Sequence, residues 1–258
     1  MLLAAAANLL LVAVSGFTAA LIARFLTGFF LAGVYPPAMK MIATWFRSAR
    51  GLAIGTVVGA LTVGKATPWL VSALVGDDLA GIVTVASCGA VAAAILVAVG
   101  YRDGPHSFER RPFDLRLAME VMRHRPTRLA VAGYLGHMWE LYAMWTWLPA
   151  FLIASFELTG QNCGTASIAA FMSIAAGGIG SLLAGLLADR LGRTTLAIAS
   201  LLISGTCALA IGSLFGGSPF LLVGVSLIWG FSVVADSAQF SAAVSELGEP
   251  EYLGTALT

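Results

Sequence analysis

Charged side chains are scarce in this sequence. They make up 10% of its 258 residues, and the formal net charge is only +1. A soluble domain usually carries about 25% charged residues, because much of any folded surface faces water. Hydrophobic residues make up 59%, and the mean hydropathy is +0.91. A soluble fold of this length could not bury so much apolar surface in one core, so the composition favours a protein of the lipid bilayer.

Groups that usually carry enzyme chemistry are also few. The three cysteines, Cys88, Cys163 and Cys207, lie far apart and form no CxxC pair, so neither a disulfide framework nor a zinc site is indicated. His106 and His124 lack metal-ligand spacing. The chain contains no GxSxG, HExxH or GxxxxGK(S/T) motif, and no basic patch interleaved with aromatic residues. We therefore expect no enzyme activity, no cofactor, no metal and no nucleic-acid partner.

Apolar runs of membrane-spanning length are abundant. A helix needs about 20 apolar residues to cross the hydrocarbon core, whereas β-barrel strands would alternate apolar and polar residues. The sequence therefore predicts an all-α, polytopic transmembrane helical bundle with about eight spans. They are roughly 1–15, 18–44, 52–75, 81–101, 129–155, 165–187, 194–215 and 219–241. The first is short and has neither a basic flank nor a cleavage site, which favours a helix that lacks its start over a signal peptide.

Positive charge gathers in alternate loops between these spans. The loops after the second, fourth and sixth spans hold Arg47, Arg50, Arg102, Arg110, Arg111, Arg116, Arg123, Arg125, Arg128, Arg190 and Arg193. The opposite loops hold Asp77, Asp78 and Glu157, and no lysine or arginine. By the positive-inside rule the arginine-bearing loops are cytoplasmic. We expect a multi-pass protein of the cell (inner or plasma) membrane.

The polar stretch 102–128 divides the chain into two hydrophobic halves, 1–101 and 129–258. Within it, 115–124 (LRLAMEVMRH) has the spacing of an amphipathic surface helix. A solvated cytoplasmic linker with ordinary positive-inside charge is the interpretation that we favour over a lipid-binding or regulatory segment.

Three stretches carry a family resemblance. The sequence GLLADRLGR at 185–193, followed by two threonines, resembles the loop signature G-x-x-x-D-R-x-G-R-(R/K) of the major facilitator superfamily. RFLTG at 24–28 resembles the fourth-helix pattern R-x-x-x-G of that family, and WFRSARGLAIG at 45–55 resembles its loop into the fifth helix. The remaining chain matches the family in the spacing of its spans.

The resemblance implies a secondary transporter that works by alternating access about a midplane site. The family has about twelve helices in two halves joined by a cytoplasmic loop. If 185–193 lies between the eighth and ninth helices, this chain resembles helices three to ten and the start of the eleventh. Residues 1–101 would then be the remainder of the N-terminal half, and 129–258 most of the C-terminal half. The resemblance also implies a conformational-gating loop formed by Gly185, Asp189, Arg190, Gly192 and Arg193, where Asp189 would pair with a neighbouring arginine or cap a helix.

Ionisable side chains at membrane depth are costly and default to functional hypotheses. The candidates for substrate binding or proton coupling are Arg24, Tyr35, Lys65, Tyr134, His137, Glu140, Asp236 and Gln239. Arg24 and Tyr35 are expected on one helical stripe with Gly28 and Leu31. The resemblance implies a coupling role for Arg24, and a structural arginine near the outer interface is the equal alternative.

The fifth span places Tyr134, His137 and Glu140 on one face, in steps of three residues. We favour proton transfer by Glu140 with His137 assisting, over a purely structural Glu140–His137 pair. On the last span, Asp236 and Gln239 share a stripe with Trp229 and Ser232, and Asp236 is either a cavity group or a charge at the cytoplasmic exit.

Lys65 lies near the middle of the third span and needs a carboxylate partner or an anionic ligand. Contact with an organic anion is one interpretation. Pairing with Asp236 or Glu140 is the other, and the one that we weigh as stronger.

We therefore predict a transporter of a small organic solute, with an organic anion among the candidates, by proton-coupled uptake. The alternatives are a truncated, non-transporting membrane protein, or a sensor or scaffold on a transporter fold. Drug or metabolite export is less favoured, because the run 55–64 lacks the Gly-Pro pair that resemblance to antiporters would require. The glycine and serine repeats at every fourth residue of 51–59 and 177–185 predict close helix packing. The oligomeric state stays open.

Overall fold

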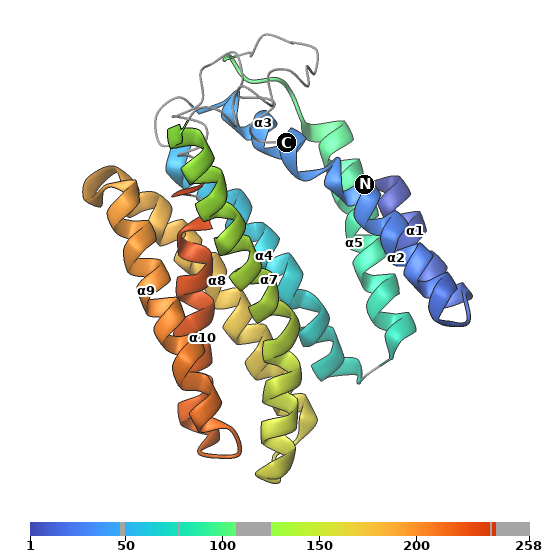
Figure 1. Ribbon diagram of the computed structural model, residues 1–258. Coiled ribbons are helices and arrows are strands. Elements are labelled where there is room, and N and C mark those ends of the chain that lie inside the picture. The colour runs from blue at the N-terminus through green and yellow to red at the C-terminus, as the bar shows by residue number, and fades with distance from the viewer. Residues whose placement is uncertain (47–49, 77, 107–124, 238, 241–258) are drawn as a thin grey trace.

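The computed structural model describes residues 1–46, 50–76, 78–106, 125–237 and 239–240, and all regular structure in these residues is helical (Figure 1). The helices are α1 (Leu2–Ala13), α2 (Phe17–Ala32), α3 (Tyr35–Ala43), α4 (Arg50–Val75), α5 (Leu79–Gly100), α7 (Arg125–Leu158), α8 (Cys163–Leu191), α9 (Arg193–Ile211) and α10 (Pro219–Ala235), with a 3₁₀ turn η1 (Gly212–Leu214). The helical prediction is confirmed. The amphipathic segment expected at 115–124 lies outside the described residues.

The long helices run side by side in alternating directions. In the described part of the chain, six apolar stretches are long enough to cross a membrane, whereas α1 and α10 are shorter, with 12 and 17 residues. The starts of α4, α7 and α9 and the ends of α5 and α8 lie at one end of the bundle (Figure 1). Arg102 follows α5, Arg125 begins α7, and Arg190 and Arg193 lie at the end of α8 and the start of α9. These arginines therefore share this end of the bundle, which we call the arginine end.

The second predicted span, 18–44, is present as one stretch of membrane-spanning length, Phe17–Met39, but a turn interrupts its helix. The chain leaves the helical path at Gly33 and Val34, so that α2 ends at Ala32 and α3 begins at Tyr35. The Pro36–Pro37 pair explains the break, because proline donates no backbone N–H and disfavours helical geometry in the residue before it. Tyr35 consequently starts α3 and does not continue the stripe of Arg24.

Side-chain caps fix two helix starts at the opposite end of the bundle, those of α5 and α8. The Asp78 carboxylate accepts hydrogen bonds from the backbone N–H groups of Ala80 (3.1 Å) and Gly81 (3.0 Å) at the start of α5. The Asn162 side-chain oxygen accepts one from Gly164 (2.7 Å) at the start of α8. Both caps satisfy N–H groups that a helix leaves unpaired. Gly192 joins α8 to α9 with a φ of 83°, a backbone conformation that favours glycine.

The most extensive helix contact in the described structure joins α4 to α8. Its seam sets the first predicted small-residue repeat, Gly51, Gly55 and Gly59, against Gly185, Ser181 and Gly178, whereas Gly177 of the second predicted repeat packs against Gly230 and Val234 of α10. A Cβ on Gly55 would lie 2.7 Å from the backbone oxygen of Ser181, and one on Gly185 would lie 2.6 Å from that of Gly51. The Ser181 hydroxyl also donates to the Gly55 carbonyl (3.1 Å). Only residues without a larger side chain permit this approach, which explains the repeat.

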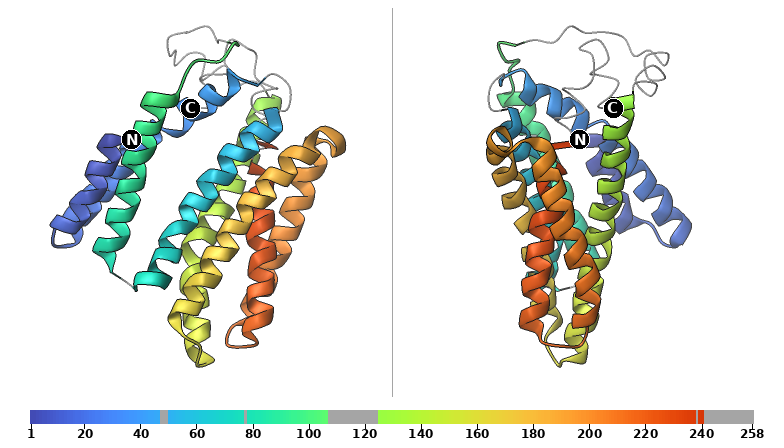
Figure 2. Two further views of the ribbon diagram at one scale, coloured as in Figure 1. Left: turned by 180° about the vertical axis from the view of Figure 1, so that it is seen from behind. Right: turned by 60° about the vertical axis from the view of Figure 1, so that its left-hand side comes forward.

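The helices form two groups (Figure 2). In one group α1 packs on α2 and on α5, and in the other α4, α7 and α10 all pack on α8. Among the described residues, few contacts join the two groups. They are made by α3 with α2 and α4, and by α4 with α5. Because α4 packs on α8, helix contacts cross the expected boundary between the halves 1–101 and 129–258, and that division stays a prediction.

Candidate functional site

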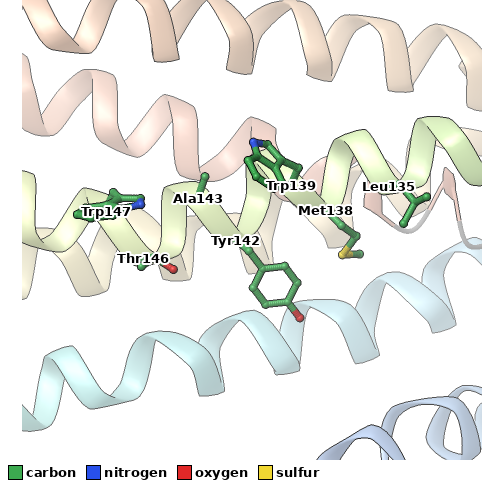
Figure 3. Close-up of a pocket in the computed structure, with 7 residues that line it drawn as sticks. All are labelled: Leu135, Met138, Trp139, Tyr142, Ala143, Thr146 and Trp147. Carbon is green, nitrogen blue, oxygen red and sulfur yellow. The ribbon is translucent and has the colours of Figure 1, made fainter. Parts of the chain in front are cut away.

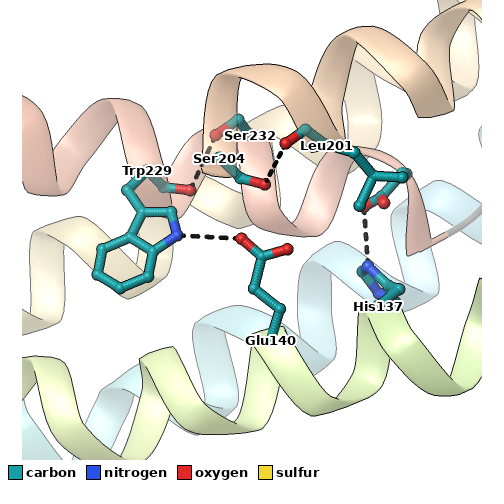
Figure 4. A network of polar contacts seen from close by, with 7 residues as sticks. His137, Glu140, Leu201, Ser204, Trp229 and Ser232 are labelled. Carbon is teal, nitrogen blue, oxygen red and sulfur yellow. Dashed lines mark hydrogen bonds and ion pairs between the residues drawn. The ribbon is translucent and has the colours of Figure 1, made fainter. Parts of the chain in front are cut away.

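A buried contact between a histidine and an aspartate joins α7 to the end of α10. His137 lies on α7, and its Nδ1 atom is 3.0 Å from Oδ1 of Asp236, the residue that caps α10 (Figure 4). Each residue is only 1% exposed. None of the four side-chain nitrogen and oxygen atoms makes a well-directed hydrogen bond within the described residues. We refer to these two residues as the His–Asp pair.

Aromatic rings enclose the His–Asp pair. The Tyr134 ring stacks on the imidazole of His137 with centroids 6.0 Å apart and planes within 8°, and the Phe240 ring lies 5.5 Å away at 33°. Tyr134 therefore shares a face with His137, as the spacing of three residues predicts. These rings exclude water from the imidazole, so a proton reaching the pair must pass between close-packed groups.

Glu140 has a different partner from the one that the sequence suggested. Its Oε1 atom accepts a hydrogen bond of 3.4 Å from the indole Nε1 of Trp229 on α10 (Figure 4). The less favoured interpretation, a structural Glu140–His137 pair, is therefore wrong, because each residue contacts α10 instead. Proton transfer by Glu140 stays a prediction. Trp229 and Asp236 are seven residues apart, about two helical turns, so they lie on the same face of α10. From this face Trp229 contacts the acidic Glu140 and Asp236 contacts the basic His137.

Arg24 is held in place by a polar residue that sequence reasoning overlooked. Its Nη1 atom donates to Oδ1 of Asn8 on α1 (3.2 Å), and the Asn8 amide in turn donates to the hydroxyl of Ser87 (3.0 Å) and the carbonyl of Val83 (3.4 Å) on α5. An asparagine inside an apolar run was the available signal, since a polar group at membrane depth requires partners. Arg24 is thus oriented by three helices, while its side chain stays exposed.

Lys65 lies on α4 and remains exposed. Its side chain makes no hydrogen bond or ion pair with any described residue. The interpretation that Lys65 pairs with Asp236 or Glu140 is therefore wrong, because those acids contact His137 and Trp229. Arg24 on α2 carries the same charge as Lys65.

An open pocket of about 500 Å³ lies along α7 (Figure 3). Its seven lining residues all lie on α7 and include three aromatic ones, Trp139, Tyr142 and Trp147, which are 81%, 55% and 71% exposed. The Tyr142 ring projects from α7 on the side of α4 (Figure 3). Trp145 is 6% exposed and packs edge-on against Tyr142, with centroids 5.5 Å apart, so it belongs to the core. The sequence predicted the abundance of tryptophan here but gave Tyr142 no role.

Comparison with known protein families agrees with this architecture. The family described as Major Facilitator Superfamily matches residues 1–258. The chain belongs to the major facilitator superfamily. A comparison with curated proteins gave no match. Membership makes the protein a multi-pass membrane transporter of a small-molecule substrate, and the resemblance inferred from 185–193 is confirmed.

The gating loop predicted for this superfamily member lies at the arginine end. Gly185 packs against the backbone of Gly51, and Gly192 makes the turn between α8 and α9. Arg190 is exposed in the last turn of α8. Asp189 lies in the same turn, and its predicted pairing falls outside the described side chains.

Gln239 belongs with this loop and lies apart from the His–Asp pair. Its Oε1 atom accepts a hydrogen bond from Nη1 of Arg193 (3.5 Å), and its amide donates to the carbonyl of Ala184 (3.3 Å). Gln239 is 2% exposed, so it connects the end of α10 to α8 and α9. This contact fits a structural or gating role better than substrate binding.

Proposed function

We propose that this superfamily member takes up a small organic solute by proton-coupled alternating access, and that the His–Asp pair binds the coupled proton. The observation that carries this proposal is the burial of His137 and Asp236, at 1% exposure each, between two helices. Ionisable groups buried at membrane depth are expensive to maintain and are typical of ion pathways and proton relays.

The chemistry of the pair supports coupling to movement. Removing two charges from water costs several kcal/mol per ion, and only good geometry compensates for that cost. When His137 is protonated and Asp236 is not, opposite charges attract α7 and α10. A proton added to the Asp236 carboxylate neutralises it and ends this attraction. The protonation state therefore changes the relative stability of two arrangements of α7 and α10, as a coupled transporter requires.

Glu140 has a supporting role in this proposal. Its hydrogen bond with Trp229 is a second link between α7 and α10, about one helical turn from His137. Because Glu140 is only partly buried, it can exchange a proton with the space beside α7 more easily than the enclosed pair. We infer that it relays protons to or from the pair.

The direction of transport is inferred from α4. Gly55 and Gly59 are used for packing on α8, and the run lacks the Gly-Pro pair that resemblance to antiporters would require. Uptake together with a proton is thus the simplest expectation.

The test is a proton-movement assay in proteoliposomes. Acetate, benzoate, succinate, alanine and glucose are added in turn to vesicles containing the full chain, and external pH is recorded. We expect at least one solute to drive alkalinisation beyond that in protein-free vesicles, which neutral acetic and benzoic acid enter unaided. Asp236→Asn should abolish this signal and solute accumulation while leaving solute exchange without a pH gradient. Glu140→Gln, which removes the proposed relay and keeps the His–Asp pair, should slow alkalinisation without abolishing it. Accumulation that persists in Asp236→Asn would contradict the proposal.

A further inference from the structure

We propose that the solute is an organic carboxylate, that the Arg24 guanidinium binds its carboxylate group, and that Asn8 is the positioning residue that holds this guanidinium. The inference rests on the proposed transport function and names the class of its substrate. It starts from a hydrogen-bond network among α1, α2 and α5, where α1 packs on the other two helices (Figure 1). The proton chemistry between α7 and α10 leaves this network unused.

Asn8 joins the three helices in one fixed orientation. Its amide nitrogen donates to the Ser87 hydroxyl (3.0 Å) and to the Val83 carbonyl (3.4 Å), both on α5. Because a backbone carbonyl accepts hydrogen bonds and never donates, the amide nitrogen must face α5. The side-chain oxygen of Asn8 is then left for α2, where Nη1 of Arg24 donates to it (3.2 Å). Val83 and Ser87 are buried, so α5 holds Asn8, and Asn8 holds the guanidinium.

The network gives Arg24 a hydrogen-bond partner but no opposite charge. Asn8 is neutral, and no described acidic side chain pairs with the guanidinium. Charged side chains in membrane-spanning segments are costly, and they usually pair with an opposite charge or line the path of an ion or substrate. Arg24 lies within the candidate span Phe17–Met39. A neutral partner therefore orients the guanidinium and leaves its positive charge for an anion.

The acidic side chains in the described part of the chain contact other groups. They are Asp78, Asp103, Glu140, Glu157 and Asp236. The charge of Arg24 therefore has no counter-ion among the described residues, which favours an anionic solute over a neutral or cationic one. Lys65 on α4 is a second exposed cation without an acidic partner in this part of the chain, and the role of Asn8 does not depend on it.

The remaining donors of Arg24 suit a carboxylate. A guanidinium offers its N–H donors in a planar fork, and two parallel donors match the two oxygens of a carboxylate. Asn8 engages Nη1, and no other described residue accepts a hydrogen bond from Arg24. The Arg24 side chain is exposed, so a solute can reach the free donors. Because the network already fixes the fork, binding loses less side-chain freedom than it would at an unsupported arginine.

Three probes test the substrate class, by calorimetry on the purified full chain in nanodiscs of zwitterionic lipid. Benzoate and acetate carry a carboxylate, whereas benzamide has the ring of benzoate without the charge. Benzoate should bind at least about tenfold more tightly than benzamide, because hydrogen bonds to charged groups are the stronger ones. Equal affinity for benzoate and benzamide would overturn the carboxylate assignment.

Substitutions of Arg24 then locate the carboxylate. Arg24→Gln should remove most of the preference for benzoate over benzamide. Arg24→Lys, which keeps the charge without the planar fork, should retain only part of it. If Arg24→Gln binds benzoate as the wild type does and loses only copurified anionic lipid, the guanidinium holds a lipid phosphate and the solute assignment is wrong.

A double-variant cycle tests the positioning role of Asn8. Asn8→Ala should weaken benzoate about threefold in the wild-type background and should have no further effect in Arg24→Gln, where no guanidinium is left to orient. Thr84→Val on α5 is the matched control, since the Thr84 hydroxyl donates to the Ala80 carbonyl of its own helix (2.7 Å), and it should leave the affinity unchanged. If Asn8 served the fold alone, Asn8→Ala would lower the midpoint of thermal unfolding and keep wild-type benzoate affinity. That result, or an equal loss of affinity in both backgrounds, would overturn the positioning role.

Asp236→Asn separates this inference from the proposed function. It should bind benzoate as the wild type does, because Asp236 contacts His137 and takes no part in the Asn8 network, yet it should fail to accumulate benzoate. If Asp236→Asn accumulates benzoate and Arg24→Gln loses binding, proton coupling through the His–Asp pair is wrong and the substrate class stands. If Asp236→Asn loses accumulation of another solute while benzoate binding is indifferent to Arg24, the substrate class is wrong and the coupling stands.

Discussion

The ionisable side chains of α2 and α4 differ from those of α7 and α10 in how they are partnered. Lys65 has no hydrogen-bond or ion-pair partner among the described residues, and the Arg24 guanidinium donates to the neutral side chain of Asn8. On α7 and α10, Asp236 contacts His137 and Glu140 contacts Trp229. The first pair is exposed, and the second is enclosed by aromatic rings.

This difference indicates that the two regions have different roles in transport. A buried pair is balanced internally, so it changes only when a proton is added or removed or when the helices move. The charge of exposed cations that lack acidic partners is balanced by an anion from solution. Coupled transport needs both properties, since it must sense protons and bind solute in one structure. Some of the substitutions below give Lys65 an acidic partner, and others remove one partner from a contact in either region.

The largest effect is expected from breaking the His–Asp pair on one side only. Asp236→Ala leaves His137 buried without its partner, which should lower the free energy of unfolding by about 3 kcal/mol. The double variant with His137→Gln and Asp236→Ala should lose clearly less unfolding free energy than the sum of the losses in the two single variants. Each single substitution already removes the whole His137–Asp236 interaction, so the sum includes that interaction twice. Thermal unfolding of the full chain in one detergent measures all four proteins. Strictly additive losses would show that the two side chains do not interact.

The next effect comes from giving Lys65 the acid that it lacks. Leu61 lies one helical turn before Lys65 on α4 and is 48% exposed. Leu61→Glu places a carboxylate at the i, i+4 spacing that favours pairing with lysine. Lys65 would then have an acidic partner on its own helix, and benzoate affinity should fall by about twofold to fivefold, because a charge pair at exposed positions is worth up to about 1 kcal/mol. Leu61→Gln is the control for size. A similar loss in both variants would mean that Lys65 charge is not involved.

Sequence periodicity predicted which face of a helix carries polar residues, but not what lies opposite. Tyr134 and His137 do share a face, and Trp229 does align with Asp236, as their spacing requires. The partner of His137 was missed because it depends on the rotation and depth of α10 relative to α7, which no single-helix pattern contains. The same limit applies to Lys65, whose expected acid partners are engaged elsewhere.

Two local misses have simpler causes. The break between α2 and α3 was signalled by Pro36–Pro37, but the uninterrupted hydropathy of 18–44 outweighed that signal. Asn8 was read as part of an apolar run, although its amide fixes Arg24. By contrast, the α4–α8 seam followed directly from the small-residue spacing, because close approach depends on side-chain size alone.

A moderate effect is expected from removing the support of Arg24. Asn8→Ala deletes the acceptor that orients the guanidinium, and we expect benzoate and acetate affinities to fall together by about threefold. The shared fall identifies the carboxylate, the group that both probes carry. Asn8→Asp should weaken both probes further, because the new carboxylate pairs with Arg24 and competes with the ligand. Unchanged affinities in Asn8→Asp would show that Arg24 does not contact the anion.

The smallest effect concerns the stability of the unliganded protein, and it is the most direct contrast between the two regions. Lys65→Met removes a charge that has no partner to lose, so the free energy of unfolding should stay within about 0.5 kcal/mol of the wild type, against the large loss in Asp236→Ala. Saturating benzoate should raise the midpoint of thermal unfolding of the wild type, because a ligand that binds the native state stabilises it, and should raise that of Lys65→Met by less. A marked loss of stability in unliganded Lys65→Met would mean that Lys65 serves the fold, and that its lack of an acidic partner is no sign of a ligand.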